Sequence, residues 1–386
     1  MVFSLCIVLR QFDSIYWLTE SAKLINLTIT RCSAHLSYFR IRMSSYSMNR
    51  PGLRPIFLYL ILPLLLFAGG WHGHNWYHHY YDCHAHRRVR LGGFRFISPL
   101  VDVELPEGYG VRQEPIHFKY KINDYVKQQM ACGRVRNISV YFRDLSDGPW
   151  FAINEDVQYN PASMMKVPVM IAWLKRAEKD PKVMKRTFIY DGKQDMSAPQ
   201  TIKPAKTLTP GVAYTVDELL RYMLNYSDNN ATALLYNALS PEELNDVLDS
   251  MDVENNPNVE TNSTTVHGYS GFFRILYNAA YLNREMSEKA LKLLSLQDFP
   301  QGIAARVPSG TVVAAKFGEF TNVAPGEDKQ LHEFGIVYHP KGPYILGIMT
   351  RGSDLAIQTE VIREISARVY AEVDANPAPP PEKVVR

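Results

Sequence analysis

Cysteine is scarce in this chain of 386 residues, and its spacing excludes several kinds of site. The four cysteines (Cys6, Cys32, Cys83 and Cys132) form no C-x-x-C pair. Because that pair is the usual signature of a zinc ribbon or a thiol redox site, we expect neither. A disulfide between Cys83 and Cys132 stays an open alternative, since a sequence does not give the distance between two cysteines.

A strong net charge is absent as well. The formal net charge is +3, and the sequence contains no basic stripe with interleaved aromatic residues. Such a stripe is typical of proteins that bind nucleic acid, so we expect no nucleic-acid partner. The hydrophobic fraction of 46% and the charged fraction of 21% fall in the range of globular proteins and exclude a wholly disordered chain. We find no internal repeat.

A long apolar run lies near the N-terminus. Residues 56–71 contain no charged side chain, and residues 53–71 approach the length of about 17–25 residues that a membrane-spanning helix needs. Arg50 and Arg54 precede the uncharged run, and positive charge favours the cytoplasmic side. A cleaved signal peptide is the alternative to an anchor, but its apolar core is usually shorter. We therefore predict a single-pass cell-membrane anchor over 53–71, with the rest of the chain on the periplasmic or extracellular side.

The segments around this run have distinct compositions. Residues 1–47 fit poorly ahead of an anchor, and Met43 or Met48 would place a start closer to the positive flank, so we expect an overlong gene model there. Residues 72–118 begin with six histidines among aromatic residues and continue as a linker. This stalk has either an interfacial aromatic belt or a metal-binding tract. Residues 376–386 form a Pro-rich tail.

The pattern of apolar residues predicts one folded domain over 119–375. Period-2 alternation predicts strands and helical periodicity predicts helices. The expected helices are 120–130, 163–178, 216–224, 231–239, 271–283, 287–296 and 357–373, and the expected strands are 138–145, 150–154, 312–317, 333–338 and 344–350. This order favours an α+β fold, in which a five-stranded antiparallel sheet is flanked by the terminal helices and a helical block forms a second lobe.

A serine and a lysine stand three residues apart at the start of one predicted helix. Ser163 and Lys166 share a helix face at this spacing, so the amine can reach the hydroxyl. A serine hydroxyl needs a base to become a nucleophile, and a lysine serves only if its pKa is lowered. The start of the helix also supplies backbone N–H groups where an oxyanion would form. Taken alone, the pair is a weak signal, because most such pairs are solvated helix faces.

Two further motifs follow in order. Ser227-Asp228-Asn229 lies between two predicted helices, and Lys316-Phe317-Gly318 lies on a predicted strand. Each motif alone is weak, since a polar cluster between helices is usually a turn. The set S-x-x-K, S-D-N and K-T-G is the signature of class A β-lactamases and penicillin-binding proteins. The chain therefore resembles this superfamily of active-site serine enzymes over about residues 119–375.

The resemblance implies a role for each matching residue. Ser163 resembles the acylated nucleophile, and Lys166 the motif lysine that takes its proton. Ser227 would pass a proton to the leaving nitrogen, and Asp228 would brace its loop. The resemblance also implies substrate-binding groups, and these are Asn229, Lys316, Gly318 and the backbone N–H of Glu319, which would form the oxyanion hole with that of Ser163.

The chain departs from the family pattern in the third motif. Phe317 stands where the family usually has Thr or Ser, so a hydroxyl that would bind the substrate carboxylate is missing. Lys316, Thr321 and Arg351 are the candidate replacements. A substrate carboxylate would therefore need one of these residues as its partner.

The second departure concerns the base for deacylation. Class A β-lactamases use a glutamate on a loop after the second motif, and the matching stretch here is short. Glu254, with Asn258 four residues on, and Glu260 are the two candidates. Without either, acylation would proceed, but the release of a β-lactam would be slow.

The sequence leaves three functions in competition. The first is β-lactam hydrolysis through acyl-Ser163, and the second is a D-alanyl-D-alanine carboxypeptidase or related peptidoglycan peptidase that acts on stem peptides. The third is a catalytically silent binding domain, although complete S-x-x-K and S-D-N motifs count against it. We expect a monomer without cofactor or metal, because serine, lysine and backbone donors supply the chemistry.

Overall fold

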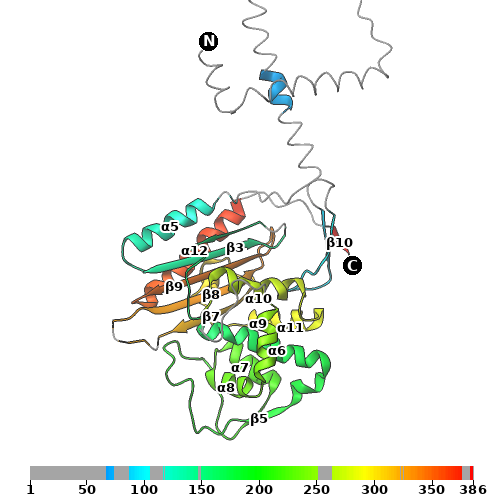
Figure 1. Cartoon of the computed structure of the whole chain (residues 1–386), viewed down its shortest axis with the longest axis vertical. Coiled ribbons are helices and arrows are strands. Elements are labelled where there is room, and N and C mark those ends of the chain that lie inside the picture. Colours follow the sequence, from blue (N-terminus) through cyan, green and yellow to red (C-terminus); the bar gives the residue numbers. More distant parts are fainter. Residues whose placement is uncertain are drawn as a thin grey trace, which may run out of the picture. The chain divides into compact units, whose positions relative to one another are not determined.

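The computed structural model describes residues 67–73, 87–104, 116, 118–146, 149–250, 263–321, 323–324, 326–375 and 383–385. The chain divides into two units, Met1–His79 and Tyr80–Arg386. In the first unit residues 67–73 are helical. The second unit contains the sheet, the helical lobe and the three sequence motifs (Figure 1).

A five-stranded antiparallel sheet forms the centre of the second unit, as the sequence predicts. Its strands are β3 (Asn137–Asp144), β4 (Trp150–Ile153), β7 (Val313–Phe320), β8 (Lys329–Val337) and β9 (Tyr344–Gly352). Their order is β4-β3-β9-β8-β7. Strand β7, which carries the third motif, therefore lies at an edge of the sheet and pairs with a strand on one side only.

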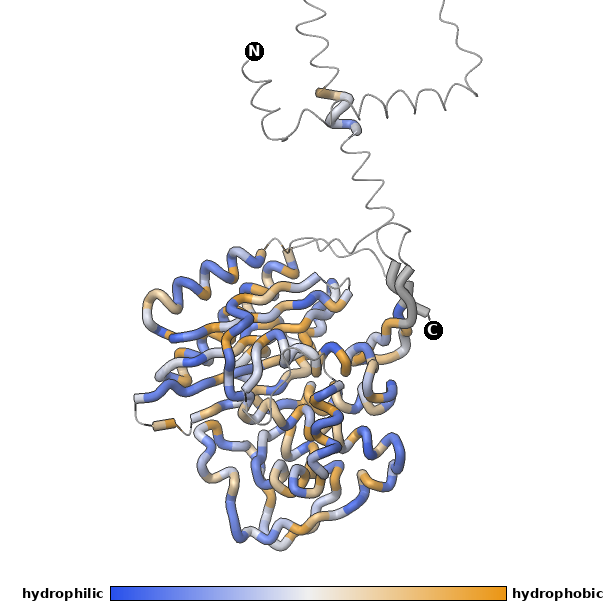
Figure 2. The backbone as a smooth tube through the Cα atoms, viewed as in Figure 1, coloured by the Kyte–Doolittle hydropathy of each residue, from blue (hydrophilic) through white to orange (hydrophobic). Residues whose placement is uncertain are grey.

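The two faces of this sheet pack against different helices. Along β3, Val140 and Phe142 belong to the apolar cluster that includes α5 (Lys119–Ala131) and α12 (Leu355–Ala375). Tyr141, on the opposite face, belongs to the cluster of the helical lobe. Alternating side chains of a strand point to opposite faces, so a sheet buried on both sides needs this pattern. Figure 2 shows apolar residues along the strands and polar residues on the outer sides of the helices.

The helical lobe comes from the middle of the chain. Its helices are α6 (Lys166–Lys179), α7 (Val216–Asn225), α8 (Asn229–Asn237), α9 (Pro241–Asp249), α10 (Val266–Asn278) and α11 (Arg284–Leu294). The shorter elements are η2 (Ala162–Met165), η3 (Pro181–Lys185), η4 (Ile303–Arg306), β5 (Thr187–Ile189) and β6 (Ala213–Thr215). Trp173 of α6 is fully buried at the centre of the lobe, and its indole donates to the carbonyl of Leu235 at 3.1 Å.

Helix starts account for the main differences between the predicted and observed elements. Helix α9 was not predicted, although Ser240 and Glu243 form a capping box ahead of it. Helix α8 begins at Asn229, two residues before the predicted start, because the Asp228 side chain caps it by accepting from the Asn230 amide. The second motif is therefore the N-terminus of a helix, with its serine just outside.

The predicted linker and tail contain three short strands. Residues 87–104, assigned to a linker, form β1 (Arg87–Leu91) and β2 (Leu100–Glu104). In the predicted tail, β10 (Lys383–Val385) pairs with β1 in parallel. These strands lack a long apolar period, so the sequence pattern does not reveal them.

Strand β1 and the segment that follows it are attached to the domain by single side chains. The Arg90 guanidinium donates to the Leu145 carbonyl at 2.9 Å and to Asn278 Oδ1 at 3.0 Å. Phe96 is buried, and its backbone N–H donates to the Glu288 carboxylate at 3.0 Å. The ordered unit therefore extends well ahead of the predicted boundary at residue 119.

The predicted membrane segment lies largely outside the described residues. Of residues 53–71, only those from Phe67 onward are described, as part of a helix that ends at residue 73. Among the described residues, no helix combines the length and the apolar character that a membrane span requires.

Candidate active site

Ser163 lies in a tight turn that leads directly into a helix. The turn is η2, and α6 continues from it at Lys166. Ala162, just before the serine, has a φ of 49°, in the left-handed region that residues with a side chain rarely adopt. Its backbone N–H donates to Asn160 Oδ1 at 2.8 Å, which stabilises this conformation. Ser163 is half-buried and lies at the point where the chain changes direction.

Buried side chains from other elements fix this turn. His332 of β8 lies with Nε2 3.1 Å from the carbonyl of Asn160, and its Nδ1 accepts from the Thr350 amide at 3.2 Å. This pairing places the ring hydrogen on Nε2, and burial lowers the pKa of His332 to about 3, so the ring is neutral. The Tyr269 hydroxyl donates to the carbonyl of Met164 at 2.7 Å.

Strand β7 packs directly on the serine turn through Gly318. A Cβ atom added to this glycine would lie 2.9 Å from the Pro161 carbonyl oxygen and 3.0 Å from the Met164 amide nitrogen. Both contacts are with backbone, which cannot move aside as a flexible side chain can. The glycine of the third motif therefore sets the distance between β7 and the nucleophile.

The three motifs meet at the Ser227 hydroxyl. Lys166 Nζ lies 3.0 Å from Ser227 Oγ, and it also donates to the Ser227 carbonyl and to Asn229 Oδ1, both at 2.7 Å. Lys316 Nζ lies 3.1 Å from the same Oγ and donates to the Phe317 carbonyl at 2.8 Å. Within the described part of the chain, no hydrogen bond joins the Ser163 hydroxyl to Lys166. Catalytic hydrogen bonds are often loose before substrate binds.

Both lysines are buried, and this changes their acidity. Burial lowers the pKa of Lys166 to about 7, although Asp228 and Glu319 oppose the shift. Burial also lowers the pKa of Lys316 well below the ordinary value of a lysine, and nearby Lys166 lowers it further. A neutral amine has a lone pair that can accept a proton. The site can therefore hold an amine base beside Ser163 at neutral pH.

Ser227 adopts an unusual backbone conformation. Its φ is 59°, and only 1% of its surface is exposed. In this position its carbonyl accepts from Lys166 and, at 3.1 Å, from Gln200 Nε2. Left-handed residues with a side chain cost of the order of 1–3 kcal/mol and occur preferentially at functional sites.

Asp228 stabilises the loop beside the site and does not face it. Its Oδ1 accepts from the Ser197 hydroxyl at 2.6 Å and from the Asn230 amide at 2.9 Å. Its Oδ2 accepts from the Leu208 amide at 3.0 Å. The buried carboxylate thus joins the start of α8 to residues 195–208, which we call the crossing loop.

The crossing loop passes from the second motif to the edge of β7. At one end Gln200 bonds to the Ser227 carbonyl. At the other, the Ile202 amide donates to Glu319 Oε1 at 2.9 Å, and Thr201 Oγ1 donates to Thr321 Oγ1 at 3.1 Å. These contacts border the site on the side of the crossing loop and also occupy Thr321, one of the predicted carboxylate partners.

The open edge of β7 presents a backbone donor beside the serine turn. The Phe317 N–H points away from β8 and donates to Gln297 Oε1 at 2.7 Å. Alternate residues of an antiparallel strand direct their N–H groups to the same edge, so the Glu319 N–H faces outward too. It follows Gly318, which touches the serine turn. This geometry suits the predicted oxyanion donor.

Phe317 is part of the core and does not replace the missing hydroxyl. Its ring stacks on Phe299 with centroids 4.2 Å apart, and it is 3% exposed. Behind it, Gln297 Nε2 donates to Glu333 Oε1 at 3.0 Å. Burial raises the pKa of Glu333 to about 7. The backbone of the third motif is therefore hydrogen-bonded to Gln297, which is in turn hydrogen-bonded to the buried Glu333.

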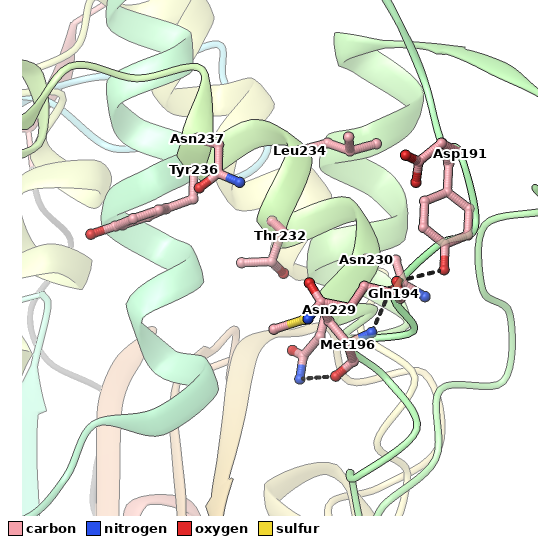
Figure 3. A pocket seen from close by; sticks show the side chains of 11 residues that line it. Asp191, Gln194, Met196, Asn229, Asn230, Thr232, Leu234, Tyr236 and Asn237 are labelled. Carbon is pink, nitrogen blue, oxygen red and sulfur yellow. Dashed lines mark hydrogen bonds between the residues drawn. The ribbon is translucent and has the colours of Figure 1, made fainter.

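A cavity of about 460 Å³ adjoins the site at Asn229. It continues along α8, and Tyr190, Met196, Thr232 and Tyr236 are among its lining residues (Figure 3). The Asn229 side chain lies between this cavity and Lys166, to which its Oδ1 is bonded. Its Nδ2 donates to the Met196 carbonyl at 3.3 Å.

The structure does not bring Arg351 to this cluster, and two other predicted site residues lie outside the described residues. Arg351 lies on β9, which β8 separates from β7, and its guanidinium donates to Gln158 and lies 5.1 Å from the centroid of the Tyr159 ring. In the described residues, none of its contacts is with a motif residue. Glu254 and Glu260 lie outside the described residues, so the base for deacylation stays a prediction.

Several contributing residues were missed by sequence reasoning. Gln200, Gln297, His332 and Glu333 act through contacts with residues that are distant in sequence. Only the last two carried a local signal, because a histidine and a glutamate in an apolar strand mark buried polar groups. The role of the Glu319 side chain was missed too, although its backbone was predicted.

Comparisons with known proteins identify the family and the fold. Residues 118–373 match the Beta-lactamase enzyme family. A β-lactamase structure from Sphaerobacter thermophilus is 20% identical, with a TM-score of 0.57, covering 68% of this chain and 100% of the other. A class A β-lactamase from Mycobacterium abscessus is 21% identical, with a TM-score of 0.56. This match covers 66% of this chain and 100% of the other.

A third solved structure, of a point mutant of PBP-A as an acyl-enzyme complex with penicillin G, is 22% identical, with a TM-score of 0.55. It covers 66% of this chain and 95% of the other. A search of curated proteins finds no match. The fold and the three motifs define an active-site serine protein of the β-lactamase type. The chain belongs to the Beta-lactamase enzyme family.

Proposed function

We propose that this domain is a serine hydrolase that is acylated at Ser163 and hydrolyses β-lactams. In the first step the Ser163 oxygen attacks the lactam carbonyl carbon, and Lys166 takes the hydroxyl proton. The carbon–nitrogen bond then breaks, and the nitrogen receives a proton through Ser227. In the second step water attacks the ester, which releases the acid and restores the serine.

The shared contact of both lysines with Ser227 Oγ is the observation that carries this proposal. It joins the amine beside the nucleophile to the hydroxyl beside the leaving group, through bonds of 3.0 and 3.1 Å. A proton taken from Ser163 therefore has a short route to the leaving nitrogen. A silent binding domain would have no need to bury two lysines around one serine, since burying an amine is costly.

The cavity beside Asn229 supports the same proposal. Its volume of about 460 Å³ falls in the range of small-molecule sites, about 300–1,000 Å³. We propose that it takes the part of the substrate on the acyl side of the scissile bond.

A peptidoglycan peptidase that acts on stem peptides is the second candidate. It is favoured by the predicted anchor over 53–71, which would keep the domain beside the cell wall. We further propose that the N-terminal segment holds the domain at the outer face of the cell membrane, close to such a substrate.

The lifetime of the acyl-enzyme separates the two candidates. We would label the full chain with a fluorescent penicillin, using Ser163→Ala as the blank, and follow the loss of label. Release within seconds supports a β-lactamase, and an adduct that lasts hours supports a peptidase. Glu254→Gln and Glu260→Gln then test the base for deacylation. If neither variant slows release, both residues are excluded from that role.

A further inference from the structure

The side chain of Glu319 brings a carboxylate to the oxyanion hole. Its backbone N–H faces the open edge of β7, and the carboxylate of a glutamate cannot lie more than about 6 Å from its own amide nitrogen. Any carbonyl oxygen bound at that N–H is therefore close to the carboxylate. Glu319 is half-buried, and its Oε1 accepts from Ile202. Burial raises the pKa of its carboxyl, and the backbone N–H groups of Ile202 and Thr201 oppose this shift.

The groups that could balance a second negative charge are engaged or neutral. Lys203 donates to the Ala198 carbonyl at 2.5 Å. Arg351 contacts Gln158 and Tyr159 instead. Burial lowers the pKa of both Lys166 and Lys316, so neither amine is a full cation at neutral pH. The charge of Lys203 already acts on the Glu319 carboxylate, so a carboxylate on the substrate would meet a carboxylate at β7 whose neighbouring cation is engaged.

The residue that usually supplies a hydroxyl for a substrate carboxylate is also lost. Phe317 stacks in the core, and the next hydroxyl along the strand, that of Thr321, accepts from Thr201. The edge of β7 therefore combines a missing hydroxyl at 317 with an added carboxylate at 319. Both differences disfavour the binding of a substrate carboxylate.

We infer that Glu319 determines specificity by disfavouring acyl donors with a negative charge on the leaving group and favouring those whose leaving group is uncharged or cationic. The inference rests on the proposed acylation of Ser163 and adds a substrate class to it. Two unit charges about 6–8 Å apart at an effective dielectric constant of about 20 interact strongly enough for a 10- to 100-fold effect on rate.

The test compares three forms of one β-lactam. Benzylpenicillin carries a carboxylate, its methyl ester is uncharged, and an aminoalkyl ester is cationic. The second-order rate of Ser163 acylation is measured at pH 8 for the full-length wild type, Glu319→Gln and Glu319→Ala. Because the ratio of free acid to ester is compared between proteins, the intrinsic reactivity of each probe cancels. Glu327→Gln, which removes one charge from the β7–β8 connection, is the matched control.

Glu319→Gln should raise the rate for the free acid about 10- to 100-fold, leave the methyl ester within about twofold, and lower the rate for the aminoalkyl ester. The glutamine keeps an oxygen that accepts from Ile202, so the crossing loop stays attached. An unchanged ratio of free-acid to ester rates in Glu319→Gln would overturn the inference. An increase of this ratio in Glu319→Ala alone would also overturn it, because the effect would then come from release of the crossing loop. If no probe labels wild-type Ser163, the proposed function itself fails, and the inference with it.

Discussion

Two amines and one hydroxyl form the chemical centre of this site. Lys166 and Lys316 lie 3.0 and 3.1 Å from Ser227 Oγ, and both are almost fully buried. Two full cations so close together in a buried place would repel each other strongly, which favours the neutral form of at least one. The pKa of about 7 for Lys166 makes it the amine that can change its charge near neutral pH.

The acylation rate should therefore depend on pH through Lys166. The neutral amine is the base, so the rate constant for acylation by penicillin should rise about tenfold per pH unit below pH 7 and level off above it. Lys166→Ala should lower the rate by about 10²- to 10⁴-fold and abolish this break. Lys179→Ala, an exposed lysine of the same helix, should keep both the rate and the break. A wild-type profile that stays flat from pH 5 to 8 would contradict the role of Lys166 as base.

The same pKa shift has a consequence for stability. The folded pKa lies below the value of 10.5 for an ordinary lysine, so the unfolded chain binds this proton more tightly between pH 7 and 10.5. The contribution of Lys166 to the free energy of unfolding is therefore least favourable below pH 7, and it improves as pH rises toward 10.5. Lys166→Met should reduce this slope in denaturant unfolding measured across that range, and the lowered pKa of Lys316 should leave a slope of the same sign.

At the level of elements, the close packing of β7 on η2 controls the geometry. Gly318 lets the strand that bears Lys316 approach the turn that bears Ser163. The predicted oxyanion donor, the backbone N–H of Glu319, belongs to the next residue in the chain, so its distance from Ser163 depends on this contact. Small displacements of catalytic groups are costly, because donors act only at hydrogen-bond distance.

Gly318→Ala should impair acylation more than folding. The new methyl group would lie 2.9 Å from the Pro161 carbonyl oxygen, so η2 and β7 must separate by a few tenths of an ångström. We expect a loss of about 10²-fold in acylation rate and a cost of about 1–3 kcal/mol in the free energy of unfolding. Gly352→Ala on β9, where the nearest atom is an ordinary 3.4 Å away, is the control and should change the rate little. Equal rates for the two variants would show that the contact does not position the site.

Elements with strong periodicity were predictable, and those set by single contacts were not. The strands of the sheet and the helix that follows Ser163 came from apolar alternation and periodicity, which burial on defined faces imposes. Helix α9 was missed because its signal is a cap at Ser240 and not an apolar run. Strands β1 and β10 were missed because they are only five and three residues long and belong to a small separate sheet with β2.

For the molecule as a whole, only those site residues that belong to one of the three motifs could be predicted from the sequence. Ser163, Lys166, Ser227 and Lys316 lie in three segments far apart in sequence, and the order of the motifs indicated that they meet. The crossing loop gave no such signal, because its contacts depend on where the folded chain brings Gln200 and Ile202. The proposed role of the Glu319 side chain in specificity depends on its position at the unpaired edge of β7, which the sequence alone does not show.

The segment ahead of the predicted domain should matter for stability and not for chemistry. The Arg90 guanidinium is bonded to Leu145 and Asn278, neither of which contacts a motif residue through these bonds. Arg90→Ala leaves buried acceptors without their donor, so we expect a loss of about 2–4 kcal/mol in the free energy of unfolding. The acylation rate of the folded variant should stay within about twofold. A tenfold drop in that rate without a change in stability would contradict this division.

The location of the penicillin adduct tests the central claim most directly. The full chain is incubated with benzylpenicillin, its intact mass is measured, and the modified peptide is sequenced by mass spectrometry. We predict one penicilloyl group per chain on the peptide that contains Ser163, and none on Ser163→Ala. A wild-type chain that gains no mass, or an adduct on another residue that persists in Ser163→Ala, would contradict acyl transfer at this serine.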